Sequence, residues 1–220
     1  MRVNTATNTL IQIAELNIEY VESFTYPGGI ISKTGGTEED IKSRIGKAPH
    51  VFVTLKPVWN SRNILIKTKL NIFNSNVKSV LLYGSETWTH TKGLVSKLQV
   101  FVNTCLRQIL RIRWPDTISN EDLWRRTQHI PIPETIKERK WRWVGHTLRQ
   151  YPTSITRQAL DWNPQGKRRR GRPTTTCRRG LDIELRTYGI SWCEAKHEAQ
   201  DRSGWKTVVK ALCSGRDEED

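Results

Sequence analysis

Apolar residues recur at intervals of three and four along three segments in the first half of the chain. This is the spacing of one face of an α-helix. The segments are Ile41–Leu55, Ile66–Leu81 and Leu94–Ile109. Helices with one apolar face bury it against each other, so the pattern predicts a three-helix bundle. The stripe residues are Ile41, Ile45, Ala48, Phe52 and Leu55; Ile66, Leu70, Phe73, Val77, Val80 and Leu81; and Leu94, Leu98, Phe101, Cys105 and Ile109.

Two signals refine the first helix. The segment Thr37–Asp40 has a hydroxyl followed by three acids, which predicts a capping box at the helix start. Pro49 lies inside the stripe and lacks an N–H, so it predicts a kink there. Gly84 and Ser85 interrupt the second stripe, and Trp114-Pro115 follow the third.

The N-terminal segment has a different pattern. Met1–Thr5 and Val21–Ile31 mix β-branched and aromatic residues, and Gly28-Gly29 provide a turn. This predicts a small antiparallel ribbon, which needs something to pack on because a two- or three-stranded ribbon alone is marginal.

Shorter helices are predicted in the second half. Asn120 would cap a helix that includes Leu123 and Trp124, and Pro133 would begin one that ends near Leu148. Beyond a basic loop, Thr176–Tyr188 would be a helix ended by Gly189, and Ser191–Glu194 would be a capping box. Gly204 would divide Ser191–Cys213 in two. The predicted fold class is mostly α, with a small N-terminal antiparallel β ribbon, a helical bundle, then short helices and a basic loop.

Charge adds a functional expectation. The chain has 36 Lys and Arg against 22 Asp and Glu, a net charge of +14. Residues 107–180 carry +12 of this, whereas residues 181–220 carry −3 and end in the acidic tail Asp217–Asp220. Lys167–Arg179 contains seven basic residues and no acid, and its glycine and proline exclude a helix interior. Such a run binds a polyanion, of which a nucleic-acid backbone is the commonest, or is a solvated linker or nuclear-import signal.

A second basic segment is Glu138–Trp143. Trp141 and Trp143 would point to nearly opposite sides of a helix, Trp141 into the core with Val144 and Leu148. Trp143 would stack on a base, or alternatively both rings would be buried. The residues predicted to contact nucleic acid are Lys137, Arg139, Lys140, Arg142, Trp143, Lys167, Arg168, Arg169, Arg170, Arg172, Arg178 and Arg179.

No catalytic or metal site is predicted, and no cofactor. A two-metal polymerase needs clustered carboxylates, but the adjacent acids here, at Glu38–Asp40, Glu121-Asp122 and the tail, fit helix-dipole stabilisation or solvation. The five histidines form no ligand pair, and the four cysteines lack metal-binding spacing and are expected to be free thiols. A zinc site around Cys193 and His197 is the conceivable exception.

The sequence contains no apolar stretch that could span a membrane and no signal peptide. The expected location is therefore the nucleus or the cytoplasm, with nucleic acid as the partner and no membrane.

Seven segments, in order, resemble the C-terminal part of a non-LTR retrotransposon (LINE-type, RTE-like) endonuclease–reverse transcriptase. They read FTYPGG, IKSRIGKA, KTKLNIF, VLLYGSETW, LRQILRIRWPD, RKWRWVGH and RRRGRPTTT. The resemblance covers Met1 to about Cys177. It implies that 1–32 is a remnant of the palm, 33–113 a thumb-like helical bundle and 114–161 the short helices of a C-terminal extension. Residues 162–175 would be the basic loop, and 176–220 the C-terminal helices and tail.

The resemblance also implies a function. The parent protein would be an RNA-directed DNA polymerase with an endonuclease, whereas this chain would lack both catalytic parts and bind template RNA or target DNA, with upstream reverse-transcriptase domains as partners where present. Three residues depart from the family pattern: Pro27, Pro49 and Cys177. They leave two alternatives open, a decayed structural fragment without function and a host-recruited nucleic-acid adaptor.

Overall fold

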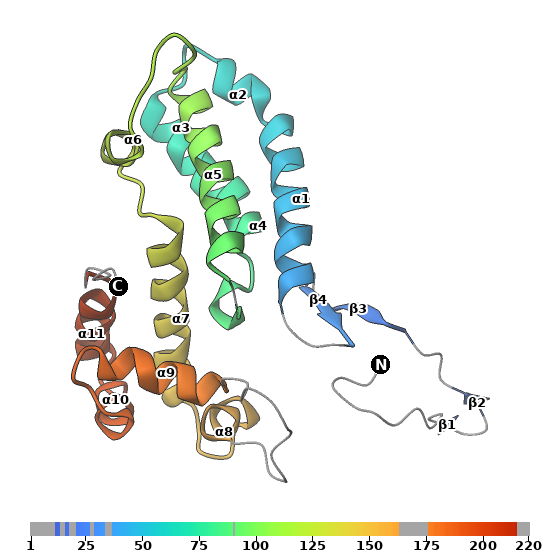
Figure 1. Ribbon diagram of the computed structural model, residues 1–220, viewed down its shortest axis with the longest axis vertical. Helices are drawn as coiled ribbons and strands as arrows, with labels where there is room; N and C mark the ends of the chain where they lie inside the picture. Colours follow the sequence, from blue (N-terminus) through green and yellow to red (C-terminus); the bar gives the residue numbers. More distant parts are fainter. Residues whose placement is uncertain are drawn as a thin grey trace. The chain divides into compact units, whose positions relative to one another are not determined.

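The computed structural model describes residues 12–13, 16–17, 21–26, 29–33, 37–89, 91–162 and 176–214. The protein is mostly α-helical with antiparallel β structure near the N-terminus, as the sequence predicted (Figure 1). The predicted strand Met1–Thr5 and the basic run Lys167–Arg172 lie outside the described residues. The chain forms two compact units, 1–133 and 134–220, which are described separately.

Two short hairpins precede the helices of the first unit. Strands β1 (Gln12–Ile13) and β2 (Leu16–Asn17) pair with each other, and β3 (Ser23–Tyr26) pairs with β4 (Gly29–Ser32). In the second hairpin Tyr26 lies opposite Gly29. All four residues of β3 are exposed, whereas Ser32 in β4 is buried and β4 packs against α1. The predicted ribbon is therefore confirmed between residues 21 and 32, and the helix supplies the surface that it needs.

Helices then make up the rest of the first unit. They are α1 (Glu38–Thr54), α2 (Lys56–Asn60), α3 (Ile66–Ile72), the π-helix η1 (Phe73–Lys78), α4 (Ser79–Leu81), the 3-10 helix η2 (Ser85–Thr87), α5 (Lys92–Ile109) and α6 (Asn120–Thr127). Figure 1 shows α1, the α3–α4 segment and α5 side by side. α1 continues without interruption through Pro49.

The predicted bundle core is largely confirmed. Fully buried residues from each stripe include Ile41 and Ala48 of α1, Phe73 and Val77 of η1, and Leu98 of α5. The Phe52 and Phe73 rings meet edge to face, with their centroids 6.3 Å apart. This contact joins the first and second stripes.

One predicted stripe position, Ile66, is exposed, and Phe101 is half-buried, as are Ile45, Leu55, Leu70 and Val80. Ile66 is 51% exposed because it is the first residue of α3. Phe101 is only half-buried because the buried side of α5 is centred on Leu98, Val102 and Leu106. Val102 was not in the predicted stripe, and it takes the central place that Phe101 was expected to have.

The predicted capping box at Thr37–Asp40 is also wrong. The Thr37 hydroxyl makes no cap bond; it donates to the Thr89 carbonyl and accepts from the Thr89 N–H. Asp40 is buried, and its carboxylate accepts from the Ile30 N–H at 3.2 Å and from the Trp88 indole N–H at 3.1 Å. Arg44 completes the site as an ion-pair partner at 3.4 Å. Asp40 thus ties the β3–β4 hairpin, α1 and the turn after α4 together.

A buried lysine fixes one end of the bundle. The Lys69 ammonium donates to the carbonyls of Trp59 at 2.9 Å and Ser61 at 2.6 Å. Arg111 donates to Ser61 and to the Asn60 carbonyl at 2.7 Å. Both cations therefore satisfy carbonyl groups at the C-terminal end of α2, which helix geometry leaves without partners. Burial lowers the pKa of Lys69, and the charge of Arg111 lowers it further.

Helix α6 belongs to the first unit because a buried amide fastens it to α5. The Asn103 side chain accepts from the Trp124 indole N–H at 2.9 Å and donates to the Asn120 side chain at 3.1 Å. Asn120 was predicted to cap the helix, and this prediction is wrong. Ser119 caps it instead, since its hydroxyl accepts from the Asp122 N–H.

The second unit contains α7, which starts at the boundary (Ile132–Leu148), α8 (Ile155–Asp161), α9 (Cys177–Arg186), α10 (Trp192–Glu198) and α11 (Arg202–Ser214). Its core includes Trp141, Val144 and Leu148 on one face of α7, as the sequence predicted. Thr176 caps α9, Gly189 has the left-handed φ of +68° after it, and the capping box at Ser191 and Glu194 is present.

Trp205 packs α11 against α7 in the second unit. Its indole N–H donates to the Trp141 carbonyl at 3.0 Å, and the two rings lie edge to face at 6.3 Å. A Cβ placed on Gly145 would lie 2.0 Å from the Trp205 ring nitrogen, so the ring packs directly on the α7 backbone. Only glycine permits this approach.

The division of the last helix is not where the sequence placed it. The break falls at residues 199–201, and Gly204 lies in the first turn of α11. Asp201 accepts from the N–H groups of Ser203 and Gly204 at 2.9 and 2.8 Å, so the aspartate starts the new helix. Those two bonds also lower the pKa of its carboxyl.

Candidate nucleic-acid interface

The two ends of the arginine-rich segment are held in the core of the second unit. Leu160 of α8 and Leu181 of α9 belong to the same buried cluster, and the two helices pack against each other. Five of the predicted phosphate contacts, Lys167, Arg168, Arg169, Arg170 and Arg172, lie outside the described residues. Both helices that flank this segment belong to the second unit.

Asp161 is the centre of the contacts at the base of this loop. Its carboxylate accepts from the Trp192 indole N–H at 3.0 Å, from Lys196 at 2.6 Å and from Arg178 at 3.4 Å. Arg178 also pairs with Asp182 at 3.1 Å. Its guanidinium lies over the Trp192 ring, 3.9 Å from the centroid.

The two predicted arginines at the start of α9 are in different environments. The Arg178 guanidinium is held by two carboxylates and one indole, so it would have to leave them to contact a phosphate. Arg179 is exposed, with its backbone N–H bonded to the Thr176 cap. Contact with nucleic acid stays a prediction for both, and the geometry favours Arg179.

The predicted basic residues of α7 are also in different environments. The Lys137 ammonium lies 3.3 Å from the Tyr188 hydroxyl, and Lys140 forms an ion pair with Glu184. Arg139 is half-buried. Arg142 is exposed and pairs with Glu138 one turn earlier, a contact that contributes little in water.

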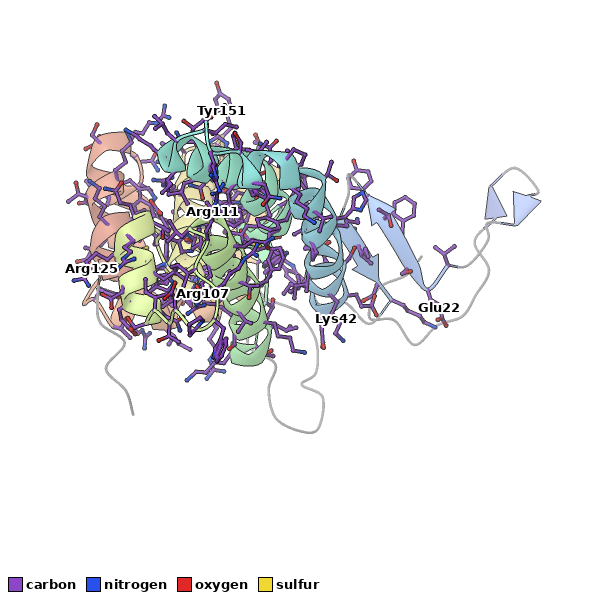
Figure 2. All side chains as sticks on the ribbon, turned by 90° about the horizontal axis from the view of Figure 1, so that it is seen from above. Glu22, Lys42, Arg107, Arg111, Arg125 and Tyr151 are labelled. Carbon is purple, nitrogen blue, oxygen red and sulfur yellow. The ribbon has the colours of Figure 1, made fainter. Side chains whose placement is uncertain are left out.

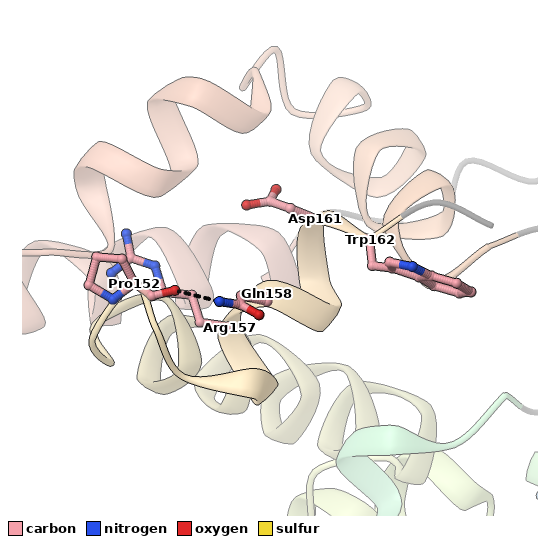
Figure 3. Close-up of a pocket in the computed structure, with 5 residues that line it drawn as sticks. All are labelled: Pro152, Arg157, Gln158, Asp161 and Trp162. Atoms are coloured by element: carbon pink, nitrogen blue, oxygen red, sulfur yellow. Dashed lines mark hydrogen bonds between the residues drawn. The ribbon is translucent and has the colours of Figure 1, made fainter. Parts of the chain in front are cut away.

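The tryptophans of the second unit are not equivalent. Trp141 is fully buried and its indole N–H donates to Glu184 at 3.0 Å. Trp143 is half-buried and packs against the same core, so the structure leaves little of its ring open for stacking. Trp162, which the sequence did not single out as a stacking residue, is 62% exposed. It lines an open pocket with Pro152, Arg157, Gln158 and Asp161 (Figure 3).

The first unit also carries many basic residues, which the net charge of +5 for residues 1–106 does not reveal. Between Ile41 and Pro115 there are thirteen basic residues and one acid, Glu86. The signal was present in the sequence, but the six acids before Ile41 offset it when the first 106 residues were summed.

Much of this charge surrounds the end of the bundle where α2, α3 and α5 meet. Figure 2 labels two of these basic side chains, Arg107 and Arg111. Four further basic residues there are exposed: Lys56, Arg62, Lys67 and Arg113. Trp114 beside them is 90% exposed. We call these four residues and Trp114 the basic end.

Histidine, cysteine and acidic side chains were also predicted not to form a metal site. Within those ranges, no group of three or more His, Cys, Asp or Glu side chains could hold a metal ion, which includes the surroundings of Cys193 and His197. All four cysteines are free, as predicted, and burial raises the pKa of the Cys105 thiol to about 12. Burial, with the charge of Lys78, lowers the pKa of His129 to about 3, so that this imidazole is neutral.

Comparisons with known proteins found a family match and a transposon-derived relative. Residues 51–83, from the last turn of α1 to two residues beyond α4, match the family described as a domain of unknown function, DUF6451. The uncharacterized transposon-derived protein F52C9.6 of Caenorhabditis elegans is 27% identical over 155 residues, which cover 66% of this chain and 54% of that protein. The chain thus spans about half the length of this curated relative. No solved structure matches it.

The similarity to a transposon-derived protein suggests that this chain originates from a transposable element. Among the helices of the described residues, none has the length and apolar character needed to cross a membrane.

Proposed function

We propose that this chain is a non-catalytic, nucleic-acid-binding segment of a non-LTR retrotransposon reverse transcriptase. It would comprise the end of the palm, the thumb and the C-terminal extension, and it would bind template RNA or target DNA through phosphates. The observation that carries the proposal is the thirteen-to-one excess of basic over acidic residues from Ile41 to Pro115, of which all but the buried Arg44 and Lys69 are at least partly exposed. A folded surface with so few acids attracts a polyanion, and phosphate contacts of this kind carry no sequence information.

Two further observations support a fragment of a larger enzyme. Strand β3 leaves Phe24 and Tyr26 exposed, at 50% and 66%, which is the state of a hairpin whose second face has another partner. The segments of the resemblance also meet in space: Asp40 joins the hairpin that contains FTYPGG to Arg44 in IKSRIGKA and to Trp88 in VLLYGSETW. Upstream reverse-transcriptase domains are the proposed partner of the exposed strand face.

The absence of catalysis is part of the proposal. Two carboxylates near basic side chains have structural partners: Asp161 accepts from Trp192, and Asp122 pairs with Arg125 and accepts from Ser119. A polymerase site needs carboxylates that are free to share two metal ions.

A decayed fragment that does not fold is the main competing explanation, and the packing argues against it. Each unit has a buried core, and two of the departures from the family pattern are accommodated. Pro49 lies within a continuous α1, and Cys177 is the exposed first residue of α9.

The proposal is tested by the salt dependence of binding. The full chain is titrated into a labelled RNA–DNA hybrid at several salt concentrations and the slope of log affinity against log salt is measured. In the first variant, the four basic residues of the basic end are replaced by glutamine: Lys56, Arg62, Lys67 and Arg113. Since each phosphate contact contributes roughly 0.7–0.9 to the slope, this variant should lose about three units of slope.

Two other variants complete the design. Neutralising Lys167, Arg168, Arg169, Arg170 and Arg172 tests the arginine-rich segment in the same way, and should remove roughly 3.5 to 4.5 units of slope. The matched control replaces four exposed basic residues of the acidic C-terminal segment, Arg186, Arg202, Lys206 and Lys210. It loses the same charge as the first variant and should keep the wild-type slope. Equal slopes for all proteins, or no binding by wild type, would refute the proposal.

A further inference from the structure

The pocket beside Trp162 has the composition of a site for one nucleobase. Its volume is about 350 Å³, at the small end of the range for small-ligand sites. One aromatic face, one proline ring, an amide, a carboxylate and a guanidinium line it (Figure 3). Stacking on a flat ring together with polar groups at the edge is how proteins hold an unpaired base.

The backbone at Trp162 is fixed although its side chain is exposed. The preceding residue, Asp161, is bonded to Trp192, Lys196 and Arg178, which belong to two other helices. Helix α8 ends at Asp161, and Trp162 adopts an extended conformation, with φ −72° and ψ 132°. An exposed indole on a fixed backbone offers a stacking surface with little ordering cost.

Polar groups lie at the other side of the pocket. The Gln158 amide donates to the Pro152 carbonyl at 3.4 Å, a long bond that leaves its oxygen as an acceptor. Arg157 is positioned by a bond from its guanidinium to the Gln150 carbonyl at 2.5 Å. Amide and guanidinium groups match the donor and acceptor edges of a base.

The sequence that follows Trp162 is strongly basic, and its first basic residue is Lys167, five positions later. Four more basic residues follow within the next five positions. Arg179, exposed at the other end of the loop, adds to the same field.

We infer that Trp162 is a base-stacking residue and that its pocket binds one unpaired nucleobase of a single-stranded nucleic acid. The inference deepens the proposed function and rests on it. An apolar peptide is disfavoured because three of the five lining residues are charged or carry an amide. A duplex would present only its stacked edges, which cannot lie flat on the indole.

The test compares single-stranded with duplex binding. Affinities of the full chain for a labelled 12-nucleotide RNA strand and for a 12-base-pair RNA–DNA hybrid are measured at one salt concentration. Trp162→Ala and Trp162→Leu should weaken single-strand binding about 5- to 100-fold, the range of one base–aromatic stack. Duplex binding should change less than about twofold, because phosphates dominate it. Trp162→Phe retains a ring and should stay close to wild type.

The matched control is Ile155→Ala, which removes an 83% exposed apolar side chain from the same helix. It should leave both affinities unchanged, and equal thermal midpoints check that each variant is folded. Wild-type affinity in Trp162→Leu, or an equal loss for strand and duplex, would overturn the inference and leave the proposed function standing. Failure of wild type to bind either probe would overturn both. Displacement of the strand by poly-glutamate that depends on Trp162 would identify an acidic peptide as the ligand instead.

Discussion

Replacing Gly145 by alanine tests the packing of the second unit most directly. Gly145 is in the interior of α7, and the new Cβ would lie 2.0, 2.3 and 2.6 Å from three atoms of the Trp205 indole. The ring is 3% exposed, so it has no free space to enter. It must move away from α7, and its N–H then loses the Trp141 carbonyl.

The expected magnitude follows from three contributions. Overpacking a core costs roughly 1–3 kcal/mol. Leaving a buried N–H without its acceptor costs about 1–3 kcal/mol more. Alanine recovers about 1 kcal/mol through its higher helix propensity. The free energy of unfolding of the second unit should therefore fall by roughly 1–5 kcal/mol.

A second glycine-to-alanine substitution serves as the control, because it should change stability in the opposite direction. Gly46 is an exposed glycine in the interior of α1, and a Cβ there meets nothing within 4 Å. Gly46→Ala should therefore stabilise the first unit by about 0.5–1 kcal/mol. Both variants are followed by urea unfolding of the full chain, with far-UV circular dichroism and tryptophan fluorescence as signals.

A double-mutant cycle identifies the cause. In a Trp205→Leu background the clash is absent, so the further change Gly145→Ala should cost little or become favourable. A Gly145→Ala protein as stable as wild type, or more stable, would refute the placement of Trp205 on the α7 backbone. An undiminished cost in the Trp205→Leu background would refute the clash as its cause.

Two more predictions concern the first unit. Phe73→Ala, at a fully buried site, should lower the free energy of unfolding by roughly 3–5 kcal/mol, and Phe101→Ala, at a half-buried site, by less than half of that; equal losses in urea titrations would contradict the burial of α5 described above. The pKa of His129 is lowered from 6.5 to about 3, so its contribution to stability is complete above pH 6.5 and is lost as the pH falls from 6.5 toward 3, by up to about 1.4 kcal/mol per pH unit. His129→Gln should flatten this part of the pH profile, and an identical profile in wild type and variant would show that another group is responsible.

Much of the fold could be predicted from local pattern. The spacing of apolar residues located α1, the segment from α3 to α4, and α5, because a helix that packs on one side repeats every three or four residues. Helix caps were predicted correctly where the bonded residues are near in sequence, as in the capping box of Ser191 and Glu194. Composition indicated a polyanion partner, because net charge does not depend on the fold.

The errors occurred where a side chain has its partner far along the chain. Thr37 and Asp40 read as a local cap, yet they bond to Thr89 and Trp88, about fifty residues later. Lys69 was not among the buried positions that the sequence predicted, but tertiary packing buries it over the end of α2.

For the candidate nucleic-acid interface, too, sequence and tertiary structure determined different features. The sequence by itself determined that the chain is strongly basic and where the arginine-rich run lies. Only the tertiary structure decided which basic groups are already engaged: Arg178 is held by Asp161 and Asp182, and Lys140 by Glu184. It also decided that Trp143 packs against the core while Trp162 is exposed, because the exposure of a ring depends on which helices cover it. Residue type and spacing describe what a side chain can do, whereas its neighbours in the fold determine whether it remains available.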